Sequence, residues 1–399
     1  MNWRRKPHHP SKRLSGRETT SWPVARPFYE LVPLLPLYLT GQLQVSSGWL
    51  GWIMSIYVLA AIISRPWFAH RVDTGDRKKI YITVYIMLAL SFSGYAAAAT
   101  ALAFFLTRFI QGLIWGGMTT SGPTMAVDII PPARRGEGLG FFGMTMTLGM
   151  CLGPVIGLQV YQQYGFYVIT WSSLLLCLAG AGIASLIRVP RSPVQDPVYE
   201  TPKKVLDRLV LRVGIPLAVN VMIATFSYGV VAVYSALYGE MHGFKYAGLF
   251  YALMGLGMLV SRFMVGRQID RGRVAELSVI SLGILTVSFG ALALAPLEWI
   301  YYASAILIGF GFGIFIPTFQ TMKLNMADRG HRGAVNSTFF TAFDIGVGTG
   351  MFLGGKIYAY LNLNWAFGAG ALLNLLAIVY FYRMSLDHYR KNKLGVDSD

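Results

Sequence analysis

The chain is poor in charged residues and in cysteine. Only 13% of its 399 residues are charged, whereas a soluble domain carries about 25%. With 54% hydrophobic residues and a mean hydropathy of +0.51, most of the chain belongs in lipid or in a lipid-embedded core. The two cysteines, Cys151 and Cys177, lie in apolar stretches and predict no disulfide or metal framework.

The usual signatures of enzymes are also missing. The sequence has no phosphate-binding Gly-x-x-x-x-Gly-Lys loop and no constellation of nucleophile and base. Its scattered histidines show no ligand spacing with the cysteines. We therefore expect neither catalysis nor a cofactor.

A net charge of +16 could indicate a nucleic-acid partner. The positive residues instead gather in alternate loops, as the positive-inside rule requires, and no soluble basic domain carries them. The sequence therefore predicts a lipid bilayer as partner and no nucleic acid. The basic loops, a linker and the C-terminal tail should face the cytoplasm.

Charge-poor apolar segments predict eleven clear membrane spans, and the chain length allows roughly twelve at about 20 residues each. The segments are 47–68, 79–100, 101–127, 137–160, 164–187, 212–237, 246–265, 275–295, 298–322, 334–360 and 364–384.

The expected first span is unusual. The stretch 28–41 would cover only about 21 Å of a roughly 30 Å core. Charges such as Arg26 and Glu30 each cost about 2.5–3.5 kcal/mol near the membrane centre. We therefore expect a short or polar first helix whose usual first half has been replaced, after a polar, basic segment at 1–27 that lacks the apolar middle of a signal peptide.

A basic loop occurs twice in the sequence. Ser64, Arg65, Asp73 and Gly75 recur 197 residues later as Ser261, Arg262, Asp270 and Gly272. The same spacing aligns glycines of further helices: Gly112 and Gly116 with Gly309 and Gly313, and Gly149, Gly153 and Gly157 with Gly346, Gly350 and Gly354. The repeat predicts an all-α membrane protein of two similar six-helix halves, an architecture typical of transporters. The expected parts are an N-terminal segment 1–27, a first half 28–187, a linker 188–210, a second half 211–385 and a tail 386–399.

Three glycines share one face of the helix expected at 137–160. Gly149, Gly153 and Gly157 recur every four residues and would let a neighbouring backbone approach closely. Pro154 should bend the same helix. Plain packing of small residues is the alternative to a role in transport.

Taken together, these motifs resemble the major facilitator superfamily. The stretch from Arg65 to Lys79 resembles its loop between helices 2 and 3, and Arg108-Phe-Ile-Gln111-Gly112 resembles its helix 4 motif. The Gly149 to Gly157 motif is similar to that of helix 5 in the antiporter branch, and Asp128 to Gly140 resembles a loop of drug-exporter-like members. Ala69 and the shifted Gly75 depart from the loop pattern. The resemblance implies twelve helices, alternating access and a role for Arg108 in proton or substrate coupling.

Arg108 is the first candidate for a functional residue, since a charge inside an apolar span usually faces a polar cavity. Gln111 and Trp115 follow it at helical spacing on the same face. A structural bond from Arg108 to a backbone carbonyl is the alternative.

Asp344 is the second candidate, because a carboxylate deep in the span 334–360 suits proton exchange. A capping or interhelical hydrogen bond is the alternative. Asn220, Ser227 and Tyr234 recur every seven residues and line either the cavity or an ordinary polar contact between helices.

The charges of the repeated loop are candidates for a conformational gate, in which Asp–Arg pairs form in one conformation and separate in the other. Solvated loop charge is the alternative. The gate candidates are Asp73, Arg77, Asp270 and Arg273, with Asp128 and Arg135 as weaker members.

The sequence therefore predicts a monomeric secondary transporter in the cell membrane that exports a small organic solute in exchange for protons. A metabolite importer, either uniporter or proton symporter, is the first alternative. A non-transporting membrane remnant is the second, because helix 1 looks incomplete.

Overall fold

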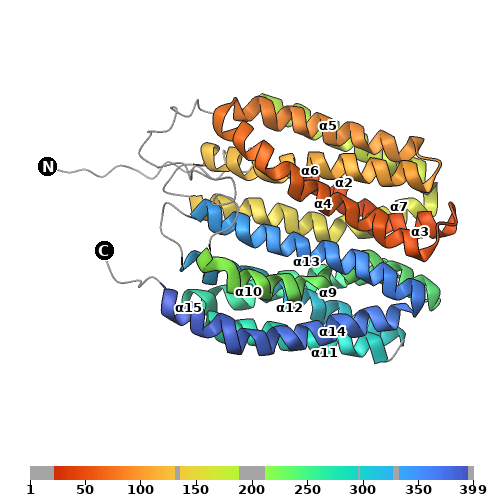
Figure 1. The fold of residues 1–399 in the computed structure, drawn as a ribbon. Helices are drawn as coiled ribbons and strands as arrows, with labels where there is room; N and C mark the ends of the chain where they lie inside the picture. Colours follow the sequence, from red (N-terminus) through yellow and green to blue (C-terminus); the bar gives the residue numbers. More distant parts are fainter. Residues whose placement is uncertain (1–21, 131–134, 188–211, 295–296, 327–331, 394–399) are drawn as a thin grey trace, which may run out of the picture.

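The computed structural model describes residues 22–130, 135–187, 212–294, 297–326 and 332–393, although the side chains of some residues next to the gaps are outside the description. The described chain forms a bundle of long, roughly parallel helices (Figure 1). Their bounds are α2 (Trp22–Leu31), α3 (Leu34–Gly41), α4 (Ser47–Thr74), α5 (Arg77–Ala97), α6 (Ala101–Ile129), α7 (Arg135–Leu186), α9 (Ile215–Met241), α10 (Leu249–Asp270), α11 (Val274–Leu294), α12 (Glu298–Leu324), α13 (Arg332–Tyr360), α14 (Leu363–Tyr380) and α15 (Leu386–Asn392). A 3₁₀ turn, Arg212–Gly214, precedes α9, and a π-helical turn, Phe381–Ser385, joins α14 to α15.

The helices group into twelve crossing segments. Nine described segments are long and apolar enough to span a membrane on their own. One of these, within α7, holds two helices, because Gly165 interrupts the 52-residue element with φ +81° and ψ 180°, a conformation open to glycine. Adding α13 and the broken helix α2–α3 completes the twelve, so the predicted all-α fold is confirmed.

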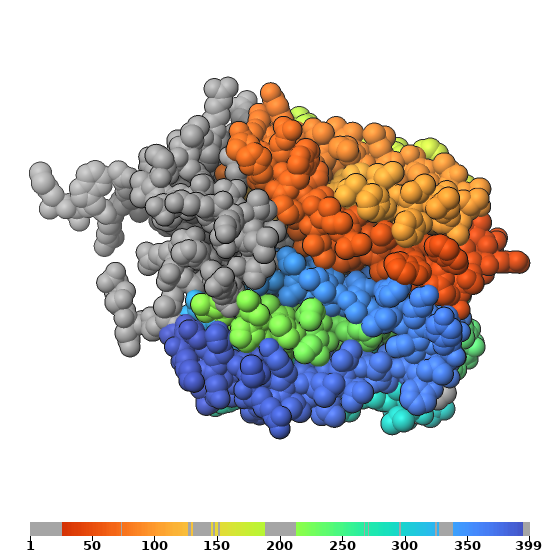
Figure 2. Space-filling model, viewed as in Figure 1, coloured from red at the N-terminus to blue at the C-terminus, as the bar shows by residue number. Residues whose placement is uncertain are grey.

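The two halves repeat the same helix contacts. A Cβ atom added to Gly116 of α6 would collide with Ser64 Oγ of α4, and one added to Gly313 of α12 would collide with Ser261 Oγ of α10. These residues match one another at the spacing of the sequence repeat. The first half occupies the upper part of the view and the second half the lower part (Figures 1 and 2).

Helix 1 is present as α2 and α3, which Val32 and Pro33 separate. Together they extend from Trp22 to Gly41, on the order of 30 Å at about 1.5 Å per residue. α2 thus begins upstream of the expected boundary at residue 28, and the helix is broken rather than cut short. The apolar side chains of α3, such as Leu34 and Leu39, are fully buried.

α2 packs against α7 through the predicted glycine motif. A Cβ atom on Gly153 would lie 3.0 Å from the Arg26 carbonyl oxygen, and one on Gly157 would lie 2.7 Å from that of Glu30. The charged side chains that were expected to make membrane insertion of this helix costly form an ion pair with each other. Arg26 Nε lies 3.2 Å from Glu30 Oε2, and Ser173 Oγ donates to Glu30 Oε1 at 2.7 Å. Because the opposite charges pair at i and i+4, burying this segment costs less than burying two isolated charges would.

α4 of the first half and α13 of the second lie side by side along the boundary between the halves (Figure 1). Near one end of the contact, Trp52 meets Phe352 with ring centroids 4.4 Å apart. A Cβ atom on Gly355 would lie 2.6 Å from the Gly51 Cα. The boundary between the halves is therefore closely packed at this end.

Candidate functional site

Arg108 lies within α6 and is only 1% exposed. Its Nη1 donates to Gln111 Oε1 at 3.0 Å and contacts the Tyr95 hydroxyl at 3.5 Å. The Tyr95 hydroxyl in turn donates to Gln111 Oε1 at 2.5 Å. The guanidinium carbon stands 4.2 Å from the ring centroid of Tyr57 on α4, in cation–π geometry. Three helices of the first half therefore hold one buried cation.

An aromatic wall adjoins this cation. Trp115, two turns beyond Arg108 on α6, stacks on Phe28 of α2 with centroids 3.7 Å apart and planes 9° apart. Phe28 also meets Tyr57 edge-on at 5.6 Å. The structure thus brings Arg108, Gln111 and Trp115 together, as their spacing predicts. Tyr57, Tyr95 and Phe28 were not predicted, because contacts between helices far apart in sequence leave no local pattern.

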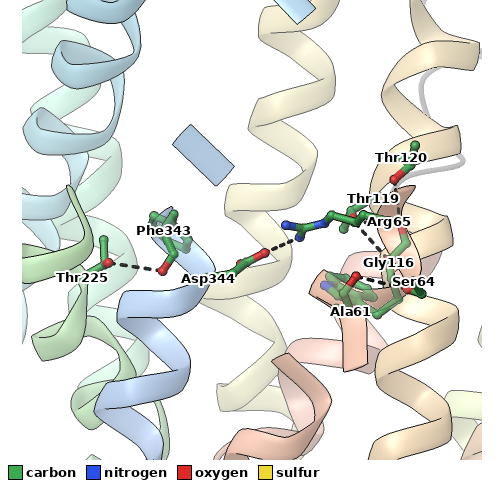
Figure 3. Close-up of polar contacts among 10 residues, drawn as sticks. Ala61, Ser64, Arg65, Gly116, Thr119, Thr120, Thr225, Phe343 and Asp344 are labelled. Atoms are coloured by element: carbon green, nitrogen blue, oxygen red, sulfur yellow. Dashed lines mark hydrogen bonds and ion pairs between the residues drawn. The ribbon is translucent and has the colours of Figure 1, made fainter. Parts of the chain in front are cut away.

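A second polar centre joins the two halves. Arg65 Nη2 of α4 forms an ion pair with Asp344 Oδ2 of α13, and Figure 3 shows the two side chains reaching toward each other. The side chains are 15% and 22% exposed, so the pair is mostly shielded from solvent. Asp344 therefore lies in an ion pair between helices rather than in a cap.

The helices on both sides of this pair are tied to their own halves. Ser64, next to Arg65, lies close against α6, since a Cβ atom on Gly116 would collide with Ser64 Oγ. Thr225 of α9 donates to the carbonyl of Phe343, next to Asp344, at 3.2 Å (Figure 3). The ion pair therefore connects two helices that each pack closely within their own half.

Arg65 could have been found from the sequence. It lies within the apolar segment predicted at 47–68, where a charge is expensive and usually has a partner or a task. Its membership in the repeated loop drew attention to Asp73 and Arg77 instead. Arg65 is the functional candidate that the sequence argument passed over.

The predicted polar face of α9 forms hydrogen bonds inside the second half. Asn220 Nδ2 donates to the Ala377 carbonyl at 2.8 Å, and Tyr234 donates to that of Met351 at 2.7 Å. Ser227 Oγ accepts from Asn374 Nδ2 at 2.9 Å. The structure does not bring these three residues together with Arg108.

The gate candidates are only partly described. The side chains of Asp73, Asp128, Arg135 and Asp270 lie outside the described residues. Arg77 Nε donates to the Val72 carbonyl at 3.2 Å. Arg273 directly precedes α11, and its Nε lies 3.7 Å from Glu276 Oε2 in the first turn of that helix. Both side chains are exposed.

A bundle of membrane-crossing helices in two matching halves, with buried charges inside and between them, defines a membrane transporter. The family model of the Major Facilitator Superfamily matches residues 28–348 and 275–398. The chain belongs to this superfamily, whose members are transporters and not enzymes. It is accordingly a multi-pass membrane protein that acts on a small-molecule substrate.

Relatives and solved structures agree with this assignment. The staphylopine export protein of Staphylococcus aureus (strain Mu50 / ATCC 700699) is 22% identical over 360 residues, covering 86% of this chain and 89% of that protein. The multidrug resistance protein MdtG of Serratia proteamaculans (strain 568) is 25% identical over 370 residues, covering 88% and 89%. An inward-facing, occupied bacterial homologue of the human lysosomal transporter Spinster shares the fold, with a TM-score of 0.75, 14% identity and coverage of 98% and 100%. The nucleoside transporter NupG shares it with a TM-score of 0.74, 13% identity and coverage of 93% and 98%.

Proposed function

We propose that this chain exports a small organic solute across the cell membrane in exchange for protons. The observation that carries the proposal is the ion pair between Arg65 and Asp344, which joins the two halves within the membrane-crossing bundle. Alternating access requires contacts between the halves to form and break on one side at a time. A carboxylate in such a contact can link that movement to a proton.

The coupling follows from the charge on Asp344. When the carboxylate is ionised, its attraction to Arg65 holds α4 against α13. A proton on Asp344 removes the negative charge and leaves Arg65 without its counter-ion, so the held conformation loses stability relative to the other. Loss of the proton on the opposite side restores the pair and completes the cycle.

The direction of transport is supported by the relatives. One is named as a staphylopine export protein, and another is named as a multidrug resistance protein. In this proposal the basic loops, the linker 188–210 and the tail face the cytoplasm, in keeping with the positive-inside rule. One chain supplies both halves of the site, which is consistent with a monomer.

The repeated loop charges act in the same proposal as a gate at the cytoplasmic ends of α4 and α10. Asp73, Arg77, Asp270 and Arg273 would form pairs in one conformation only, with Asp128 and Arg135 in the same network. Their position at or next to the ends of helices supports this role.

The test is solute-dependent proton movement in everted membrane vesicles, followed with a pH-sensitive dye across a panel of aromatic and amphipathic solutes. An interior-acid gradient should drive accumulation of a panel solute, and adding that solute should release protons from the vesicles. Asp344→Asn should abolish gradient-driven accumulation yet retain solute binding by the purified protein. Asp387→Asn, which changes an exposed carboxylate on α15, is the matched control and should behave as wild type.

Unchanged gradient-driven accumulation in Asp344→Asn would overturn the proton-coupling role. Accumulation driven only by the opposite gradient would indicate a proton-coupled importer. Accumulation to equilibrium without any gradient dependence would indicate a uniporter.

A further inference from the structure

We infer that the solute is an organic anion whose carboxylate binds one edge of the Arg108 guanidinium. This inference rests on the proposed transport function and names its substrate class. It starts from two buried nitrogen atoms of Arg108, Nε and Nη2. Among the residues that the structure describes, neither atom has a hydrogen-bond acceptor.

The two atoms are a matched pair of donors. Nε and Nη2 lie on the same edge of the planar guanidinium and point their N–H groups in parallel, which is the fork that binds both oxygens of a carboxylate. Nη1, on the other edge, is held by Gln111 and Tyr95. The cation is therefore fixed in orientation by one edge while the recognition edge stays unused.

The charge of Arg108 is also unbalanced within the described structure. Its neighbours Gln111, Tyr95 and Tyr57 are neutral polar or aromatic groups. The carboxylate of Glu30 is bonded to Arg26 and Ser173, and that of Asp344 to Arg65. A buried cation without a counter-ion is costly, so an anionic ligand would be strongly favoured at this position.

The surroundings indicate the rest of the solute. Phe28, Tyr57 and Trp115 form a contiguous aromatic group beside the guanidinium. Such a surface suits an aromatic or long aliphatic body and does not compensate a second charge. The position in the second half that matches Arg108 is Ala305, which is fully buried and apolar.

Among the residues that the structure describes, one other cation is deeply buried, and it is not part of this group. Lys323 of α12 is 3% exposed and lies over the ring of Phe339, 4.0 Å from its centroid. The cluster around Arg108 therefore offers one cationic fork, and the preferred solute is an amphipathic monocarboxylate rather than a dicarboxylate.

The experiment measures binding by the purified protein in detergent, as a ligand-dependent rise in thermal midpoint and as quenching of tryptophan fluorescence. The probes are matched pairs that differ only in charge: 3-phenylpropanoate and its amide, indole-3-acetate and its amide, and decanoate and its amide. In the wild type, at least one carboxylate should bind at least about tenfold more tightly than its amide, the scale of one charge-assisted bidentate contact.

Arg108→Gln should remove this preference, leaving acid and amide with equal affinity. Arg108→Lys keeps the charge and loses the two-pronged donor geometry, so it should retain only part of the preference for the carboxylate. This variant replaces Arg108→Gln as the test if Arg108→Gln does not fold. Arg71→Gln changes an exposed arginine on α4 and should leave the preference intact.

The inference is overturned if no carboxylate binds better than its amide, or if the full preference survives in Arg108→Gln or in Arg108→Lys. No proton gradient exists in detergent, so the result is independent of proton coupling. A preference that depends on Arg108, found together with gradient-independent flux in vesicles, would uphold the substrate class and reject only the exchange mechanism.

Discussion

The two halves of the bundle share helix contacts but bury different chemistry at matched positions. α6 carries Arg108 and Gln111 where α12, 197 residues later, carries Ala305 and Ile308. α2 buries Glu30 where α9 buries Ser227. Close packing between helices depends on shape, and both halves retain it, whereas the buried cation of α6 is matched by an apolar residue of α12.

The largest expected effect is at the buried cation. Arg108→Gln should lower the transport rate of a panel solute in vesicles at least about tenfold, the scale of one lost hydrogen bond to a charged group. Ala305→Ser, the change at the matched position of α12, should stay within about twofold, because a hydroxyl in a helix can bond to its own backbone. Comparable losses in the two variants would remove the functional contrast between the halves.

The next effect concerns stability. Glu30→Ala leaves Arg26 without its partner and Ser173 without an acceptor, so we expect about 2–3 kcal/mol lower free energy of unfolding. Ser227→Ala in the second half removes two neutral hydrogen bonds, to the Ala224 carbonyl and from Asn374, which keeps its bond to the Gly370 carbonyl. It should therefore cost only about 1 kcal/mol. Thermal midpoints of the two purified variants would show whether Glu30→Ala loses more stability than Ser227→Ala.

A double variant checks the assignment of the Glu30 effect to pairing. Arg26→Gln together with Glu30→Gln should be more stable than the sum of the two single changes predicts, because each single change leaves a charge unpaired. Strict additivity would mean that the ion pair contributes nothing to anchoring helix 1.

A smaller contrast lies in the glycines of the repeat. A Cβ atom on Gly157 would meet the Glu30 backbone at 2.7 Å, whereas one on Gly354 would meet the ring of Tyr234 at 3.0 Å. Backbone cannot move aside as a side chain can, so Gly157→Ala should destabilise by about 1–3 kcal/mol and Gly354→Ala by less. Scanning fluorimetry of the two variants would check the order, and the reverse order would contradict it.

The smallest expected change in stability is at Arg273. Its pair with Glu276 is exposed, so Arg273→Gln should change the free energy of unfolding by only a few tenths of a kcal/mol. If Arg273 belongs to the gate, the transport rate should nevertheless fall while the thermal midpoint holds. A wild-type transport rate in this variant would mean that Arg273 is an ordinary solvated loop charge with no role in a gate.

The contrast between the halves also separates features set by local sequence from features set by tertiary packing. The order and approximate extent of the helices, the repeat and the glycine contacts follow from hydropathy and spacing, so the fold prediction was confirmed. The doubt about helix 1 came from its short apolar run and from counting Arg26 and Glu30 as separate charges. Their pairing, the hydrogen bond from Ser173 and the close approach of Gly153 and Gly157 are tertiary contacts that no local pattern reports.

The residues of the candidate site also fall into a group that the sequence predicts and a group that it does not. Arg108, Gln111 and Trp115 share a helix face, so their grouping could be predicted from a period of 3.6 residues. The partner of Asp344 could not be predicted, because Arg65 lies on another helix in the other half of the chain.

By itself, the sequence determined that this protein is a two-halved helical membrane protein, since hydropathy, loop charge and repeated glycines are properties of residues in order. Only the tertiary structure decided which charges neutralise one another. It pairs Glu30 with Arg26 and Asp344 with Arg65, and it leaves one edge of Arg108 without a described partner. The physical reason is that ion pairing depends on a few ångströms between side chains, and only the packing of the helices sets that distance.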